Sequence, residues 1–266
     1  MSLPIINNIS FSSLTDFKLC PKYYNLVHIK RLKPFTNTFD TVFGSVIHAQ
    51  VQNILLKKVT TEQSVKYFSR LWNKFCKLYK AEQKFIDLEK SGVKIIETLE
   101  TSLREALGNY EVLQVEYRLQ QSLKDLFPQT FKGFIDIIFK LENGKILISD
   151  FKTTDSSFWF MKNKDAGKDY QLILYKHFFC LDMSIDIKDA EVSFILLEKN
   201  KNSKNPVKVV KVGSTKKKIE NCLKWMNSAL SAINRQKFIP NRTACFKYGE
   251  KHACVFYDTE HCPKSY

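Results

Sequence analysis

Two apolar runs separated by a short turn constrain the fold of this chain more than any other feature. The runs cover residues 130–141 and 145–152, and the turn at 142–144 contains an Asn-Gly pair, which is typical of a β-hairpin. Each run carries one aspartate, Asp136 in the first and Asp150 in the second. An apolar strand rarely buries a charge without a partner, so we expect a hairpin whose two acids are paired or bind a metal.

The length of the turn decides whether the two aspartates can cooperate. A two-residue turn would place Asp136 opposite Phe151, and the aspartates would then face opposite sides of the hairpin. A three-residue loop with Gly144 in the left-handed conformation instead places Asp136 directly opposite Asp150. Lys152 shares that face, because residues two apart in a strand project to the same side. Only the three-residue loop builds a site.

Such a site suits metal-dependent hydrolysis of a phosphodiester. Asp136 and Asp150, helped by a backbone carbonyl such as that of Phe151, are oxygen ligands for Mg²⁺ or Mn²⁺. The metal would polarise the phosphate and activate a water, while Lys152 would orient that water or stabilise developing charge. A strand pair with solvated acids on its exposed face is the alternative, because short Asp-x-Lys matches are common by chance.

Further motifs lie on both sides of the hairpin. A Gly-x-x-x-His sequence ends at His48, and an acid, Glu116, lies in the strand-like run before the hairpin. Gln171 and Tyr175 follow it, four residues apart, so they share one face of the helix predicted there. A lone histidine in an apolar helix is more often a core residue than a metal ligand. Whether His48 is assigned as a ligand therefore depends on the other motifs in the sequence.

Taken in order, with an N-terminal helix that ends at Cys20-Pro21, these motifs resemble the PD-(D/E)XK nuclease superfamily. In particular, they are similar to RecB-like exonucleases of the CRISPR-associated and AddB-type iron–sulfur branch, over most of the chain. The catalytic residues implied by the resemblance are Asp136, Asp150, Lys152, Gln171, Tyr175 and Glu116. The implied metal ligands are His48, Asp136, Asp150 and Phe151.

Four of the seven cysteines lie at the two ends of the chain, one near the start and three in the tail. The resemblance implies that they hold a 4Fe–4S cluster, although the gaps of eight and seven residues in the tail are wider than is usual in the family. Zinc, with His252 or His261 as extra ligands, and unliganded thiols are the alternatives. The four residues are Cys20, Cys245, Cys254 and Cys262.

Net charge points to a polyanionic partner. Lysine and arginine total 42 against 27 acids, which gives +15, and nucleic acid is the commonest partner for such an excess. Between Lys199 and Lys218 there are eight lysines and no acid, a pattern that favours a face tracking phosphates over a generally solvated basic surface.

The element pattern predicts an α/β fold with a mixed central β-sheet flanked by helices, a restriction-endonuclease-like core with a helical N-terminal part and a cysteine-containing tail. We expect a single domain, 1–266, with parts at about 1–110, 111–237 and 238–266. Ser12 or Ser13 is expected to cap the first helix, and Cys76, Cys180 and Cys222 to be core residues. Expected helices are 11–19, 40–57, 62–79, 84–107, 170–179 and 216–236; expected strands are 112–119, 130–141, 145–152, 190–198 and 207–212.

The functional expectation is a metal-dependent DNA exonuclease that acts at DNA ends in recombination, repair or replication, with proteins of those pathways as further partners. A structure-specific endonuclease of the same fold and a non-catalytic DNA-binding subunit are the alternatives. The chain has no Gly-x-x-x-x-Gly-Lys phosphate loop, so it is not expected to be a helicase or ATPase itself. It has no long apolar run and no export signal, so we expect no membrane association and an intracellular location, in cytoplasm or nucleoid.

Overall fold

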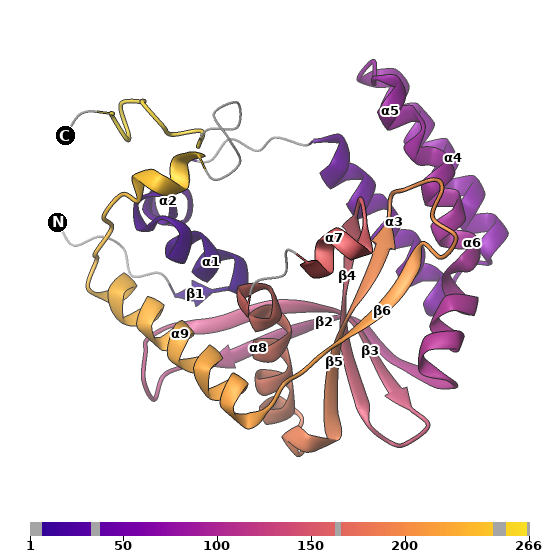
Figure 1. Cartoon of the computed structure of the whole chain (residues 1–266). Coiled ribbons are helices and arrows are strands. Elements are labelled where there is room, and N and C mark those ends of the chain that lie inside the picture. Colours follow the sequence, from indigo (N-terminus) through magenta and orange to yellow (C-terminus); the bar gives the residue numbers. More distant parts are fainter. Residues whose placement is uncertain (1–6, 33–37, 163–165, 247–253, 265–266) are drawn as a thin grey trace. The chain divides into compact units, whose positions relative to one another are not determined.

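The computed structural model describes residues 7–32, 38–162, 166–246 and 254–264 (Figure 1). The chain divides into two compact units, and the organisation as a single domain stays a prediction. All expected catalytic residues and metal ligands belong to unit 2, and the four cysteines of the expected cluster belong to unit 1. Unit 1 comprises Met1–Phe35, Gln120–Gly133 and Lys216–Tyr266, and unit 2 comprises Thr36–Leu119 and Phe134–Thr215.

Six strands form a mixed sheet. The order is β1-β3-β4-β5-β6, and β2 also pairs with β3. The β3–β4 and β5–β6 pairs are antiparallel, whereas the β1–β3 and β4–β5 pairs are parallel. The strands are β1 (Asn8–Ile9), β2 (Tyr110–Ser122), β3 (Thr130–Leu141), β4 (Ile146–Thr154), β5 (Ala190–Glu198) and β6 (Val207–Val212).

Helices cover both faces of the sheet in unit 2. The helices α3 (Phe39–Leu55), α4 (Thr61–Leu78) and α6 (Leu88–Leu107) lie together beside the sheet (Figure 1). They pack against the strand residues that alternate with the two aspartates. Phe151 and Ile137 are buried in that core. On the other face, α8 (Ala166–Asp182) packs along β4 and β5. Short helices α5 (Gln83–Ile86), α7 (Ser157–Lys162) and η2 (Ile187–Asp189) complete this unit.

The hairpin has the three-residue loop that puts the two aspartates on one face. Ile137 pairs with Ser149, and the N–H of Leu141 donates to the carbonyl of Lys145 across the turn, at 2.9 Å. Gly144 has φ +79°, in the left-handed region that glycine adopts without strain. The same register places Asp136 opposite Asp150, as the sequence predicted.

Unit 1 contains the two chain ends. The helices α1 (Phe11–Leu19), α2 (Pro21–Tyr24) and η1 (Asn25–Ile29) follow one another, and α9 (Lys216–Asn234) packs against α1. The tail contains a short helix, η3 (Arg242–Phe246), which the sequence did not predict. The expected cap of α1 was also wrong: Ser10 is the N-cap, and its hydroxyl accepts from the N–H of Ser13 at 3.2 Å.

The fold class is confirmed, and most elements lie within a few residues of their expected bounds. The helix expected at 84–107 is broken at Asp87, between α5 and α6. Cys76, Cys180 and Cys222 are buried, as expected of core residues. Among the described residues, no helix is both long and apolar enough to cross a membrane.

Candidate active site

The hairpin brings the two aspartates to one place in unit 2. Asp136 accepts a hydrogen bond at Oδ2 from the backbone N–H of Phe151, at 2.8 Å. Asp150 is only 3% exposed, and its Oδ2 lies 2.7 Å from Nζ of Lys152. Its Oδ1 accepts from Nε2 of Gln171 at 2.9 Å. Two carboxylates, one ammonium group and one amide therefore meet on one face of the sheet.

The electrostatics of this pair favour a bound cation. Burial raises the pKa of Asp136, and the charge of Asp150 raises it further, while the Phe151 N–H and the Lys152 charge lower it. Burial also raises the pKa of Asp150, an effect that Lys152 partly offsets. One ammonium thus leaves residual repulsion between two carboxylates, and a divalent cation would relieve it. Carboxylate oxygens are the ligands that Mg²⁺ and Mn²⁺ prefer, so these residues fit such a metal.

His48 approaches the hairpin from α3. Its helix can lie close to β4 because Gly44, one turn earlier, has no side chain: a Cβ there would lie 3.3 Å from Oγ1 of Thr153. The His48 and Phe151 ring centroids are 5.7 Å apart. Burial, followed by the charge of Lys152, lowers the pKa of His48 to about 4. The imidazole is therefore neutral at physiological pH, and its buried Nε2 has no hydrogen-bond partner within the described structure, as suits a metal ligand.

Glu116 reaches the pair from β2 with an unusual backbone. Its φ is +52°, which is rare for a residue with a side chain, and its carboxylate charge raises the pKa of both Asp136 and Asp150. Nε2 of Gln52 donates to Oε1 of Glu116 at 2.6 Å. Gln52 was not among the residues predicted from the sequence. The signal was present, since Gln52 follows His48 by four residues and so lies on the same face of α3.

Gln171 and Tyr175 extend from α8 to the same place. Nε2 of Gln171 donates to Asp150 and also to the Tyr175 hydroxyl, which is 3.3 Å away. Tyr175 is almost fully buried, and burial raises its pKa to about 12. It is therefore a neutral phenol at physiological pH. The expectation that these two side chains point in one direction is confirmed.

The structure thus brings together six of the residues predicted from the sequence. His48 lies beside them, since its ring is next to that of Phe151 and the charge of Lys152 acts on it. The six are Asp136, Asp150, Lys152, Gln171, Tyr175 and Glu116. Across the described parts of the chain, no three His, Cys, Asp or Glu side chains are arranged to hold a metal ion. The assignment of these residues as ligands and catalysts stays a prediction.

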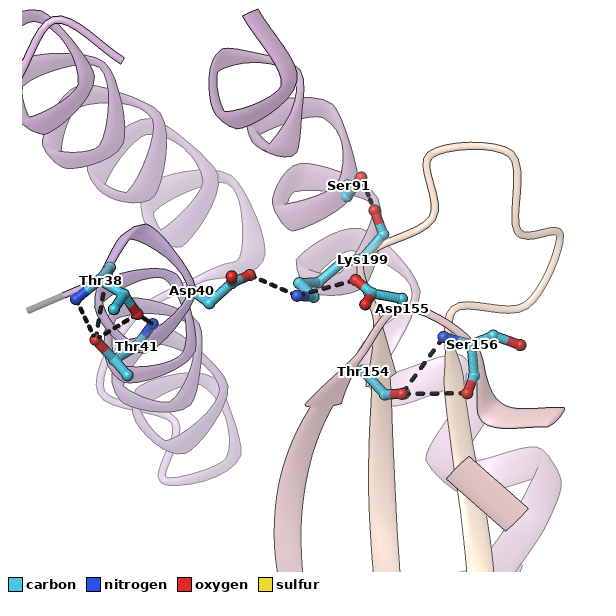
Figure 2. Close-up of polar contacts among 8 residues, drawn as sticks. All are labelled: Thr38, Asp40, Thr41, Ser91, Thr154, Asp155, Ser156 and Lys199. Atoms are coloured by element: carbon cyan, nitrogen blue, oxygen red, sulfur yellow. Dashed lines mark hydrogen bonds and ion pairs between the residues drawn. The ribbon is translucent and has the colours of Figure 1, made fainter. Parts of the chain in front are cut away.

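A cavity of about 470 Å³ opens beside Lys152 and His48, with Lys199 at its margin. Nζ of Lys199 lies 2.6 Å from Oδ1 of Asp40 and 3.0 Å from Oδ1 of Asp155, so it joins the start of α3 to the end of β4 (Figure 2). Its carbonyl accepts from the Ser91 hydroxyl of α6. These contacts fix the wall of the cavity.

The basic segment that contains Lys199 does not form a uniformly free phosphate-tracking face. At least four of its eight lysines pair with acids that lie elsewhere in the sequence, and the expectation of a phosphate-tracking face stays a prediction. Counting lysines along the chain could not reveal acids that approach only in the fold. The pairs are Lys199 with Asp40 and Asp155, Lys201 with Asp87, Lys208 with Glu198, and Lys211 with Glu191.

The four end cysteines lie near one another in unit 1, and none forms a disulfide. The Cys20 sulfur accepts from the N–H of Asn241 at 3.3 Å, and the Cys254 N–H donates to the carbonyl of Cys245 at 2.9 Å. Burial raises the pKa of Cys245, and charges on the other three thiols raise it further. These contacts place the four cysteines in one part of unit 1, but no three of them are arranged to hold a metal ion.

Of the two histidines expected as zinc ligands, the structure describes only one. His252 lies outside the described residues. His261 is described, and its Nε2 lies 3.5 Å from Oε1 of Glu260. Within the described ranges, no histidine is arranged with the thiols to hold a metal ion.

Comparison with known proteins agrees with the geometry. Residues 8–263 match the family model of the PD-(D/E)XK nuclease superfamily. The fold is similar to the crystal structure of a protein described as a "putative exonuclease" from Eubacterium rectale, with a TM-score of 0.56 and 15% identity over 87% of this chain and 81% of that chain. A crystal structure of SSO0001 is less similar, with a TM-score of 0.37 and 14% identity over 86% of this chain and 78% of that chain. No curated protein matches the sequence.

Proposed function

Because the chain belongs to the PD-(D/E)XK nuclease superfamily, we propose that it is a metal-dependent exonuclease that hydrolyses phosphodiester bonds at DNA ends. The observation that carries the proposal is the pairing of Asp136 with Asp150 on one face of the hairpin, with Lys152 and Gln171 in contact with Asp150. Recombination, repair and replication are the processes in which such an activity acts, and proteins of those processes are its proposed partners.

Four groups would hold the divalent metal: the Asp136 and Asp150 carboxylates, Nε2 of His48 and the backbone carbonyl of Phe151. When bound, Mg²⁺ or Mn²⁺ supplies Lewis-acid polarisation of the phosphate and lowers the pKa of a bound water. A neutral imidazole and two carboxylates are the forms of these side chains that bind metal.

The remaining residues act on the substrate. Lys152, whose side chain is 37% exposed, brings an ammonium group to the phosphate and stabilises the negative charge that develops during attack. Gln171 and Tyr175 flank the scissile phosphate, and the contact between Gln171 and Asp150 sets where the amide lies. Glu116, which accepts a hydrogen bond from Gln52 and whose charge acts on the carboxylate pair, would accept a proton from the attacking water.

Digestion of DNA with open and closed ends tests this proposal. Linear end-labelled DNA, single- and double-stranded, and a covalently closed circle of the same sequence are incubated with Mg²⁺ or Mn²⁺. An exonuclease shortens linear DNA from its ends and leaves the circle intact. Cleavage of the circle would instead identify an endonuclease. Binding of both DNAs without cleavage would identify a non-catalytic DNA-binding subunit and contradict the proposal.

Substitutions test the roles of individual residues. Asp136→Ala and Asp150→Ala should abolish cleavage and leave DNA binding largely intact, because they remove metal ligands and no phosphate contact. Lys152→Ala should lose activity while metal binding, measured by calorimetry, persists. Asp155→Ala is the control, since Asp155 lies three residues beyond Lys152 and is 91% exposed on its side chain. Hydrolysis by purified Asp150→Ala protein would contradict the ligand assignment.

We also propose that Cys20, Cys245, Cys254 and Cys262 hold a 4Fe–4S cluster. Support comes from the burial of three of them and from the hydrogen bonds that tie the tail to the residues around Cys20. Thiolates are the ligands of such clusters, and closing a loop between chain ends restricts the unfolded chain strongly. Zinc and unliganded thiols are the alternatives.

Metal analysis separates these alternatives. Protein purified without oxygen should be brown and should contain iron. Cys20→Ala should lose the colour and expose the tail to proteolysis, whereas Cys222→Ala, which removes a buried thiol from α9, should keep the colour. Colourless protein without iron or zinc would exclude the cluster.

A further inference from the structure

An exposed phenylalanine lies beside the candidate active site. Phe134 is in β3, two residues before Asp136, and it is 55% exposed, whereas Ile135 and Ile137 are fully buried. Alternate residues of a strand project to the same side, so the Phe134 ring lies on the side of the sheet that carries the Asp136 carboxylate. The register of the hairpin places Asp150 on that side as well.

The backbone of Phe134 is tied to the residues of the site. It acts on the Tyr175 phenol and lowers its pKa, against the larger effect of burial; the Tyr175 hydroxyl accepts from Gln171, and Gln171 also donates to Asp150. The position of Phe134 in β3, two residues before Asp136, sets where its side chain lies relative to the carboxylate pair. Among the described residues, no aromatic ring packs on the Phe134 ring. The Phe134 ring is therefore accessible next to the place where a phosphate would be cut.

Exposure alone would mean little, because single exposed apolar side chains are common on protein surfaces. Tyr67, on α4, is also 55% exposed and lies in a different layer of the unit. Phe134 differs from Tyr67 in its position two residues from a candidate metal ligand. An aromatic ring next to a bound phosphate meets the base of the nucleotide that carries that phosphate, and base–aromatic stacking is tolerant of sequence.

We propose that Phe134 stacks on the nucleobase next to the scissile phosphate, so that the site takes a nucleotide whose base is unpaired and accessible. This inference rests on the proposed nuclease function. It names single-stranded or frayed DNA ends as the substrate class, because the bases of an intact duplex are covered by their neighbours. Phe134 would thus contribute to substrate binding without taking part in the chemical step.

A double-mutant cycle between protein and DNA tests the contact directly. Binding of a short single-stranded oligonucleotide is measured by fluorescence anisotropy in an Asp150→Asn background, which prevents cleavage. A series of oligonucleotides carries one abasic nucleotide at successive positions. With Phe134 intact, an abasic nucleotide at the stacking position should weaken binding roughly 5- to 100-fold. With Phe134→Leu, the same abasic nucleotide should change binding little, because the ring that would meet the base is absent.

Two further variants make the result specific. Phe134→Trp retains an aromatic face and should restore the coupling. Tyr67→Leu removes an equally exposed ring and should leave the full penalty for the abasic nucleotide. An equal penalty with Phe134 intact and with Phe134→Leu, at every position of the series, would overturn the inference.

The stacking contact and the proposed nuclease activity can be tested separately. In digestion with Mg²⁺, Phe134→Leu should raise KM for single-stranded DNA by a similar factor and leave kcat within a few-fold. Coupling in the binding cycle without any cleavage by the unmodified protein would leave the stacking contact standing and overturn the proposed activity. Cleavage without coupling would overturn the stacking contact alone.

Discussion

Glu198, at the end of β5, is a buried carboxylate whose charge should stabilise the fold. It is 5% exposed, and its Oε1 accepts from the backbone N–H of Ser157 at 2.5 Å. Its Oε2 accepts from the Ser203 hydroxyl at 2.5 Å, and Nζ of Lys208 lies 3.2 Å from Oε1. The carboxylate therefore joins the start of α7, the loop after β5 and the strand β6.

The pKa of Glu198 gives the size of this effect. Burial alone would raise it, but the hydrogen bonds from Ser157 and Ser203 and the contact with Lys208 outweigh burial and lower the pKa from 4.5 to about 2. At about 1.4 kcal/mol per pKa unit, the charged form contributes about 3 kcal/mol to the free energy of unfolding at neutral pH. Because the folded pKa is lowered, this contribution is full well above pH 4.5. It falls as pH drops from about 4.5 to about 2.

Urea denaturation of Glu198→Gln, followed by tryptophan fluorescence, tests this account. The variant should lose about 3 kcal/mol at pH 7 and only about 2 kcal/mol near pH 3.5, where the unfolded wild-type chain is already mostly protonated at this residue. Glu191→Gln is the control. Its carboxylate pairs with Lys145 and Lys211 but its side chain is 25% exposed, so it should cost about 1 kcal/mol or less. Equal losses for the two variants, or a loss for Glu198→Gln that does not depend on pH, would refute the reasoning.

Three further substitutions have definite expected outcomes. Gly92→Ala should lower the free energy of unfolding by about 1–3 kcal/mol despite better helix propensity, because its Cβ would lie 2.2 Å from Cζ of the fully buried Phe68; thermal unfolding with no loss of stability would contradict the packing described. Gly144→Val should cost about 1 kcal/mol or more in urea denaturation, since φ is +79°, whereas Gly213→Val, which also has open space around it and no positive φ, should cost less. Lys199→Met should lower the free energy of unfolding by only about 1 kcal/mol in the same assay, because both of its carboxylate partners are largely exposed. A much larger loss would show that these two ion pairs stabilise the fold more than their exposure implies.

Elements whose structure depends on residues close together in the sequence could be predicted from the sequence. The strand at 130–141 and the hairpin strands at 190–198 and 207–212 lie where alternation and turn residues placed them. The register of the first hairpin followed from one glycine, because only a left-handed residue at Gly144 allows the three-residue loop. Gln171 and Tyr175 could be expected together because a helix sets which residues share a face.

Contacts between residues distant in the sequence could not be predicted in this way. Gln52 and Glu116 are 64 residues apart, and nothing local to Glu116 indicates a positive φ in a strand. The acids that neutralise Lys199 come from α3 and from the residue after β4, so the basic segment looked free when read alone. In each case the missing information was the packing of one element against another.

The turn and the carboxylate pair both depend on the register of the hairpin. Whether strain in the turn would change that register depends on which costs more free energy, the strain or a slip by one residue. A slip by one residue would turn Asp136 into the apolar core that Ile137 and Phe139 now fill. Burying an unpaired carboxylate costs several kcal/mol, and moving Phe139 out of the core would cost about 2 kcal/mol more. Strain at Gly144 costs only about 1 kcal/mol or more, so Gly144→Val should destabilise the protein without changing the register. Its DNA cleavage, measured well below its melting temperature, should therefore survive, because the core and not the turn alone holds Asp136 opposite Asp150.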